Sequence, residues 1–82
     1  MFTHIDEPVQ VETFFSGRKI IPRWFLWNGR KINITRITQT WEEREGGHKT
    51  YHFAVYDGQS VFNIIFDPAG LAWRLDGICD GL

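Results

Sequence analysis

The stretch that decides the fold is residues 22–34, PRWFLWNGRKINI, in which side chains alternate in polarity on both sides of Asn28-Gly29. Asn-Gly is the preferred loop of a two-residue β-hairpin, because both central residues of a type I′ turn need positive φ. This turn sets Phe25 opposite Ile32 and directs Trp24 to the other face. The stretch therefore predicts a β-hairpin with an apolar inner face.

The same two-residue alternation, broken by glycine turns, continues along the chain, and no segment fits a helix template at length. The sequence therefore predicts an all-β domain, a six-stranded antiparallel meander. The strands are expected at residues 9–15, 20–27, 30–44, 49–56, 60–66 and 71–78. Residues 1–8 are expected to be a flexible N-terminal tail, and residues 9–82 a single β domain. Asp57-Gly58 is expected as a second two-residue turn, which would set Phe53 opposite Phe62.

A curved sheet is expected because the long third strand changes phase. Ile34 and Ile37 differ in parity, so we expect a β-bulge near Thr35-Arg36 that turns Ile37 and Trp41 inward. A long, bulged strand favours a sheet curved into an SH3-like half-barrel or small barrel. The expected inner face consists of Phe25, Trp27, Ile32, Ile34, Tyr51, Phe53, Phe62, Ile64, Phe66, Trp73 and Leu75.

The hairpin carries the pattern P-x-x-F-x-W-x-G-R, formed here by Pro22, Phe25, Trp27, Gly29 and Arg30. The chain resembles, over roughly residues 8–80, a family of short uncharacterised bacterial proteins with a domain of unknown function. Some members are linked to error-prone DNA polymerases of the Y family. The resemblance implies a shared fold, and it implies no catalytic residue because the family has no established activity.

Charge is sorted along this nearly neutral chain, because residues 13–40 hold six Lys and Arg side chains and no acid. One interpretation is single-stranded nucleic-acid binding, in which cations hold the phosphates and Trp24 stacks on a base. The candidate contacts for that function are Arg18, Lys19, Arg30 and Lys31. The other interpretation is a solvated face, with arginines lying over core aromatic rings.

The outer face of the expected sheet is not cleanly polar, because several apolar residues have the outward parity. Contiguous exposed apolar patches of this kind mark interaction sites. The expected anchors of the interaction surface are Trp24, Leu26, Val61 and Ile65. They predict self-association into a homo-oligomer or docking of a protein partner, with edge pairing by strand 9–15 as a further route.

Catalytic interpretations find little support. Cys79 is the only cysteine and has no nearby base, and His48 and His52 are too far apart along a strand to share a metal. The carboxylates Asp67, Asp76 and Asp80 are better explained by turns than by acid–base chemistry. We therefore expect a non-enzymatic module with no cofactor and no metal.

The expected location follows from the ends and the hydropathy of the chain. The N-terminus has no signal-peptide pattern, and no run approaches the roughly 18 apolar residues of a membrane span. We therefore expect a cytoplasmic protein that makes no membrane contact.

Overall fold

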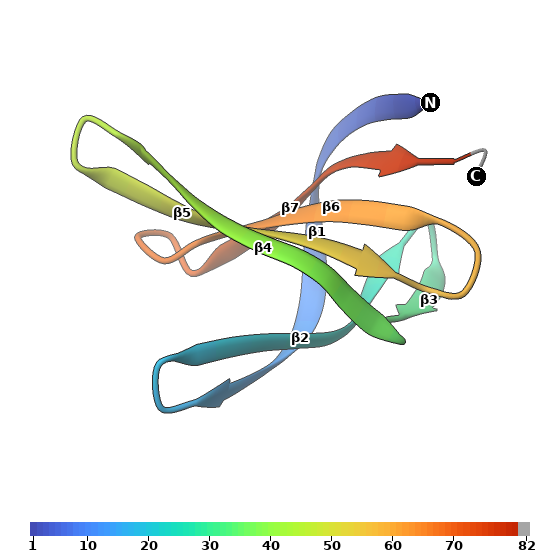
Figure 1. Ribbon diagram of the computed structural model, residues 1–82, viewed down its shortest axis with the longest axis horizontal. Coiled ribbons are helices and arrows are strands. Elements are labelled where there is room, and N and C mark those ends of the chain that lie inside the picture. The colour runs from blue at the N-terminus through green and yellow to red at the C-terminus, as the bar shows by residue number, and fades with distance from the viewer. Residues whose placement is uncertain (81–82) are drawn as a thin grey trace.

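The computed structural model describes residues 1–80 as one seven-stranded antiparallel sheet, in the order β3-β2-β1-β7-β6-β5-β4 (Figure 1). The strands are β1 Phe2–Ser16, β2 Lys19–Trp27, β3 Arg30–Asn33, β4 Arg36–Glu45, β5 His48–Tyr56, β6 Val61–Asp67 and β7 Ala72–Cys79. The all-β prediction is confirmed, whereas the count of six strands is wrong. Across the described residues there is no helix long and apolar enough to cross a membrane.

The seventh strand arises because the expected third strand is divided at Ile34 and Thr35. Before this point β3 pairs with β2, and after it β4 pairs with β5. The Ile34 N–H donates to the Arg23 carbonyl oxygen at 3.0 Å, and the Thr35 N–H donates to the Tyr56 carbonyl oxygen at 2.8 Å. The chain therefore crosses from the edge of one strand pair to the edge of another, and the expected bulge becomes a break between strands.

The first strand is longer than expected and lies inside the sheet. Residues 2–8, expected as a flexible tail, pair with β7, from Phe2 opposite Cys79 to Pro8 opposite Arg74. The second half of β1 pairs with β2. Figure 1 shows β1 running crosswise between the two groups of strands that it joins. β7 pairs with Phe2–Val9 only, so the edge of Gln10–Ser16 opposite to β2 is unpaired, and edge pairing by residues 9–15 stays a prediction.

The core lies on the inner face of the curved sheet, as the alternation predicts. Phe25 of β2 packs edge to face on Phe62 of β6 with 5.3 Å between ring centroids, although β1 and β7 separate these strands. The sheet therefore bends back over itself, but it does not close, since β3 and β4 do not pair. The buried core cluster consists of Phe25, Ile32, Phe53, Val55, Phe62, Ile64, Phe66, Trp73 and Leu75. A closed small barrel is thus not formed, and the likeness to SH3 domains stays a prediction.

The two expected tight turns have different outcomes. The Asn28-Gly29 turn is confirmed: both residues have positive φ, and Phe25 pairs with Ile32. Asp57-Gly58 is not a two-residue turn, because Phe53 pairs with Ile64 instead of Phe62. The Asp57 carboxylate accepts hydrogen bonds from the Gln59 and Ser60 N–H groups at 2.8 Å, which stabilises a longer loop. The register moves by two residues, so every side chain keeps its face.

Trp41 lies on the face opposite to the one expected. The register of β4 against β5 shifts between Ile37 and Gln39, which turns Ile37 inward and Trp41 outward. Trp41 stacks there on His52 with 5.4 Å between ring centroids. The second irregularity, which the sequence pattern did not indicate, reverses the orientation after Thr38.

Candidate interaction surfaces

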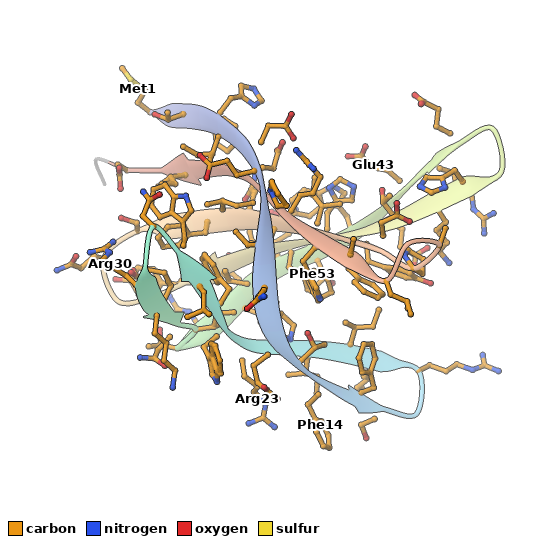
Figure 2. The ribbon with its side chains drawn as sticks, turned by 180° about the vertical axis from the view of Figure 1, so that it is seen from behind. Met1, Phe14, Arg23, Arg30, Glu43 and Phe53 are labelled. Atoms are coloured by element: carbon orange, nitrogen blue, oxygen red, sulfur yellow. The ribbon has the colours of Figure 1, made fainter. Side chains whose placement is uncertain are left out.

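The outer surface of β1 and β2 carries apolar side chains beside basic ones. Phe14 is 50% exposed and Leu26 is 41% exposed, with the half-buried Trp24 also on β2. The guanidinium carbon of Arg23 lies 5.4 Å from the centroid of the Phe14 ring, and the Nζ atom of Lys31 lies 4.6 Å from the centroid of the Trp24 ring. Figure 2 shows Phe14 and Arg23 close to each other on one side of the molecule. These five residues are called the outer hairpin patch.

The four anchors expected from the sequence do not form one surface. Trp24 and Leu26 lie together on β2, whereas Val61 and Ile65 lie on β6, with β1 and β7 between these strands. Val61 and Ile65 are half-buried in their own part of the sheet. Phe14 joins the first pair because it lies on β1 opposite Ile21 of β2. Phe14 was not among the expected anchors, because alternation along residues 9–15 gives the outward parity to one of the neighbours Phe14 and Phe15 without deciding between them.

The basic residues of the expected nucleic-acid surface are divided between the two ends of β2. Arg18 and Lys19 lie at the β1–β2 turn, and Arg30 and Lys31 follow the β2–β3 turn. The nine residues of β2 span roughly 26 Å at about 3.3 Å per residue. Within residues 1–80, none of the six cations of segment 13–40 makes an ion pair. Their charge is therefore available to an external anion.

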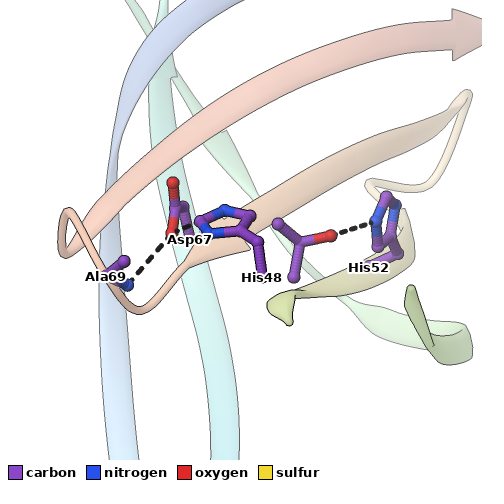
Figure 3. A network of polar contacts seen from close by, with 5 residues as sticks. His48, His52, Asp67 and Ala69 are labelled. Carbon is purple, nitrogen blue, oxygen red and sulfur yellow. Dashed lines mark hydrogen bonds and ion pairs between the residues drawn. The ribbon is translucent and has the colours of Figure 1, made fainter. Parts of the chain in front are cut away.

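The histidines take part in separate polar contacts on β5 (Figure 3). The Nε2 atom of His52 lies 2.9 Å from the Thr50 hydroxyl and 3.8 Å from a Glu43 carboxylate oxygen. The Nε2 atom of His48 lies 3.4 Å from the Oδ1 atom of Asp67. His52 pairs with Ile65 of β6. Residues 1–80 contain no group of three or more His, Cys, Asp or Glu side chains that could hold a metal ion.

The late carboxylates have structural contacts. Asp67 accepts a hydrogen bond from the Ala69 N–H at 3.0 Å inside the β6–β7 turn, and Asp80 accepts one from the Ser60 hydroxyl. Asp76 lies in β7, where the register against β6 is irregular. Cys79 is half-buried near the end of β7. The structure does not gather these residues into one acid–base site.

A cleft of about 460 Å³ opens between the start of β2 and the β4–β5 pair. Its lining includes Arg18, Lys19, Thr40, Glu42, Tyr51 and Phe53. Glu42 is bound to Lys49 at 3.1 Å, and this contact raises the pKa of Lys49, with a smaller contribution from Tyr51. The cleft could not be expected from local sequence patterns, because it depends on the break between β3 and β4 at Ile34 and Thr35. Pro22 was the one local signal, because proline favours an edge position in a strand.

The fold and these surfaces define a small all-β domain with an open sheet and a basic, aromatic outer hairpin. The chain belongs to the family described as Domain of unknown function (DUF6504), whose sequence model matches residues 1–76. The resemblance to an uncharacterised domain family is thereby confirmed. Comparison with curated proteins and with solved structures gave no match.

Proposed function

We propose that this protein is a non-enzymatic interaction module that self-associates through the outer hairpin patch. The observation that carries the proposal is the exposure of Phe14 and Leu26 beside Trp24, with Arg23 and Lys31 at the rim. Large apolar side chains ringed by charge are typical of interaction hot spots. A different protein with the same surface chemistry as the second copy is the alternative partner.

The charges favour a head-to-tail contact. Two copies of the outer hairpin patch facing each other would bring Arg23 and Lys31 against their own copies, which is repulsive. All ten acidic residues lie outside 13–40, and the exposed Glu43 and Glu45 of β4 are among them. The patch of one copy would therefore bind the β4 end of the next. Contacts of this heterologous kind build rings or open chains.

Chemical-shift mapping over a concentration series tests which surface is used. We expect the Trp24 indole and Leu26 methyl signals to shift with concentration, while the Val61 and Ile65 methyl signals stay in place. Because exposed charges contribute, the shifts should shrink when salt is added. Shifts confined to β6 would contradict the proposed surface, and an absence of shifts would contradict self-association.

A second candidate function is the binding of single-stranded nucleic acid. It is favoured by Lys31, which lies over Trp24 and has no ion-pair partner within residues 1–80. Stacking on an aromatic ring and phosphate neutralisation by nearby cations are the two elements of such sites. The proposed link to Y-family polymerases makes DNA damage tolerance the setting in which to look, and the proposed location is the cytoplasm.

Fluorescence anisotropy with labelled oligothymidine at two salt concentrations tests this candidate. Binding should weaken steeply with salt and fall in Arg30→Ala/Lys31→Ala and in Trp24→Ala. The Arg18→Ala/Lys19→Ala variant shows whether both ends of β2 contribute. Absent or salt-insensitive binding would rule the candidate out.

A further inference from the structure

Two strand edges face the cleft between β2 and β4. β4 pairs only with β5 along its length, and β3 covers only Trp24–Trp27 of β2. The edge of β2 before Arg23 is therefore unpaired, as is the outer edge of β4. The two edges meet near the Ile34–Arg23 hydrogen bond, and Figure 1 shows them diverging towards the β1–β2 and β4–β5 turns.

The cleft offers more than free backbone groups. Phe53, which belongs to the buried core, and the half-buried Tyr51 form part of its lining. With a volume of about 460 Å³, it lies within the range of roughly 300–1,000 Å³ that is typical of ligand sites. An occupant would therefore cover apolar surface as well as pair with an edge.

The charges at the cleft are unbalanced. Glu42 is held by Lys49, whereas Arg18 and Lys19 have no acidic partner anywhere in residues 1–80. The wall on the β2 side is therefore positive and uncompensated. This positive wall therefore favours an occupant that carries negative charge.

We propose that this cleft binds an extended acidic segment of a partner protein, which pairs with the β4 edge as an added strand. A peptide suits the site better than a nucleic acid because its backbone alternates N–H donors and C=O acceptors, which a strand edge requires. The added strand pairs with β4 and not with β2, because Pro22 has no N–H to donate. Acidic side chains of the segment lie near Arg18 and Lys19, and its apolar side chains cover Tyr51 and Phe53.

The probe is a fluorescein-labelled seven-residue peptide in which Glu and Val alternate, tested by anisotropy against the full chain. The Arg18→Glu/Lys19→Glu variant should weaken binding by at least about tenfold, because two attractive charges become repulsive. The matched control is Arg30→Glu/Lys31→Glu, which makes the same charge change at the other end of β2. This control should change the affinity for the peptide by less than about twofold, because the length of β2 separates its charges from the cleft and salt screens charges over such a distance.

Backbone pairing has its own readouts. The same peptide with every backbone nitrogen methylated should not bind, and the amide hydrogens around Thr40 and Glu42 should exchange more slowly in the complex. If the peptide binds but amide exchange around Thr40 and Glu42 does not slow, the proposal that the peptide adds a strand to β4 is overturned. Equal weakening in both charge variants, or no binding by the wild type, would overturn the site.

The outcome separates this cleft from the outer hairpin patch. Weakening by Arg30→Glu/Lys31→Glu alone would place the peptide on the patch and contradict the cleft. Displacement of the peptide by oligothymidine, with the cleft variant weakening both ligands, would make the occupant a nucleic acid and overturn the peptide proposal. Failure at the cleft leaves self-association through Trp24 and Leu26 intact, because neither of these residues lines the cleft.

Discussion

Phe25 and Phe62 pack edge to face with ring centroids 5.3 Å apart, across the interior of a sheet in which two strands separate them. This contact joins the β2–β3 hairpin to the β4–β7 strands. Because β3 and β4 do not pair, side-chain packing and β1 hold the curvature. The cleft and the outer hairpin patch both depend on this arrangement.

Replacing Phe25 by alanine should destabilise the protein by about 3–5 kcal/mol, since it opens a cavity at a fully buried site. Chemical denaturation followed by tryptophan fluorescence measures the change. Leu71→Ala is the control, because Leu71 is 80% exposed, and it should cost no more than about 0.5 kcal/mol. A small effect of Phe25→Ala would mean that the hairpin does not close over the core.

Gly77→Ala should loosen the first half of β1. A Cβ at Gly77 would lie 2.5 Å from the Thr3 carbonyl oxygen and against the Phe2 ring, so the paired backbone must move. We expect a loss of about 1–3 kcal/mol and faster amide exchange in residues 2–5. Gly70→Ala is the matched control, since its Cβ would make only an ordinary contact with Ala72. Unchanged exchange would contradict the pairing of this segment with β7.

Asp57→Ala should cost about 1 kcal/mol, because the Gln59 and Ser60 N–H groups lose their acceptor. Asp57→Asn keeps an acceptor oxygen and should retain most of the stability. Thermal unfolding of both variants measures the difference. Equal losses would show that the negative charge matters and the hydrogen bonds do not.

Glu42→Gln should lower the pKa of Lys49 towards its ordinary value of 10.5, because the Glu42 carboxylate is the main cause of the raised pKa. A raised pKa stabilises the fold below 10.5, and this contribution disappears as the pH rises through the raised pKa. The variant should therefore lose less stability than the wild type at alkaline pH. An NMR titration of the Lys49 side chain measures the shift, and Glu45→Gln should leave it unchanged.

Local pattern was enough to predict the fold class and the inner face. The register of β2 against β3 could be predicted because the Asn28-Gly29 turn depends only on the conformations of its own two residues. Elsewhere the expected register of β5 against β6 was wrong by two residues, which left every side chain on its correct face. Side chains alternate between the two faces of a strand with a period of two residues, so a register error of two leaves the same side chains facing inward. The inner face could therefore be predicted although the pairing was wrong.

Features that depend on distant partners could not be predicted in this way. Residues 2–8 have no strong strand pattern and become ordered through β7, which lies at the other end of the chain. The break at Ile34 and Thr35 depends on hydrogen bonds to Arg23 and Tyr56 from two different strands. The separation of Trp24 from Val61 follows from the strand order, which places β1 and β7 between β2 and β6, and the cleft follows from the break.

Solution mass by light scattering tests the central claim most directly, for the wild type, Trp24→Glu and the control Thr3→Glu. Thr3 is exposed in the first half of β1, where it pairs with Ile78 of β7, and it does not belong to the outer hairpin patch. Measured from about 10 µM to about 1 mM, where weak association shows, the wild type and control should rise above the 9.6 kDa monomer. Trp24→Glu should stay at that mass. A monomeric wild type throughout this range, or an oligomer that Trp24→Glu leaves intact, would contradict self-association through the outer hairpin patch.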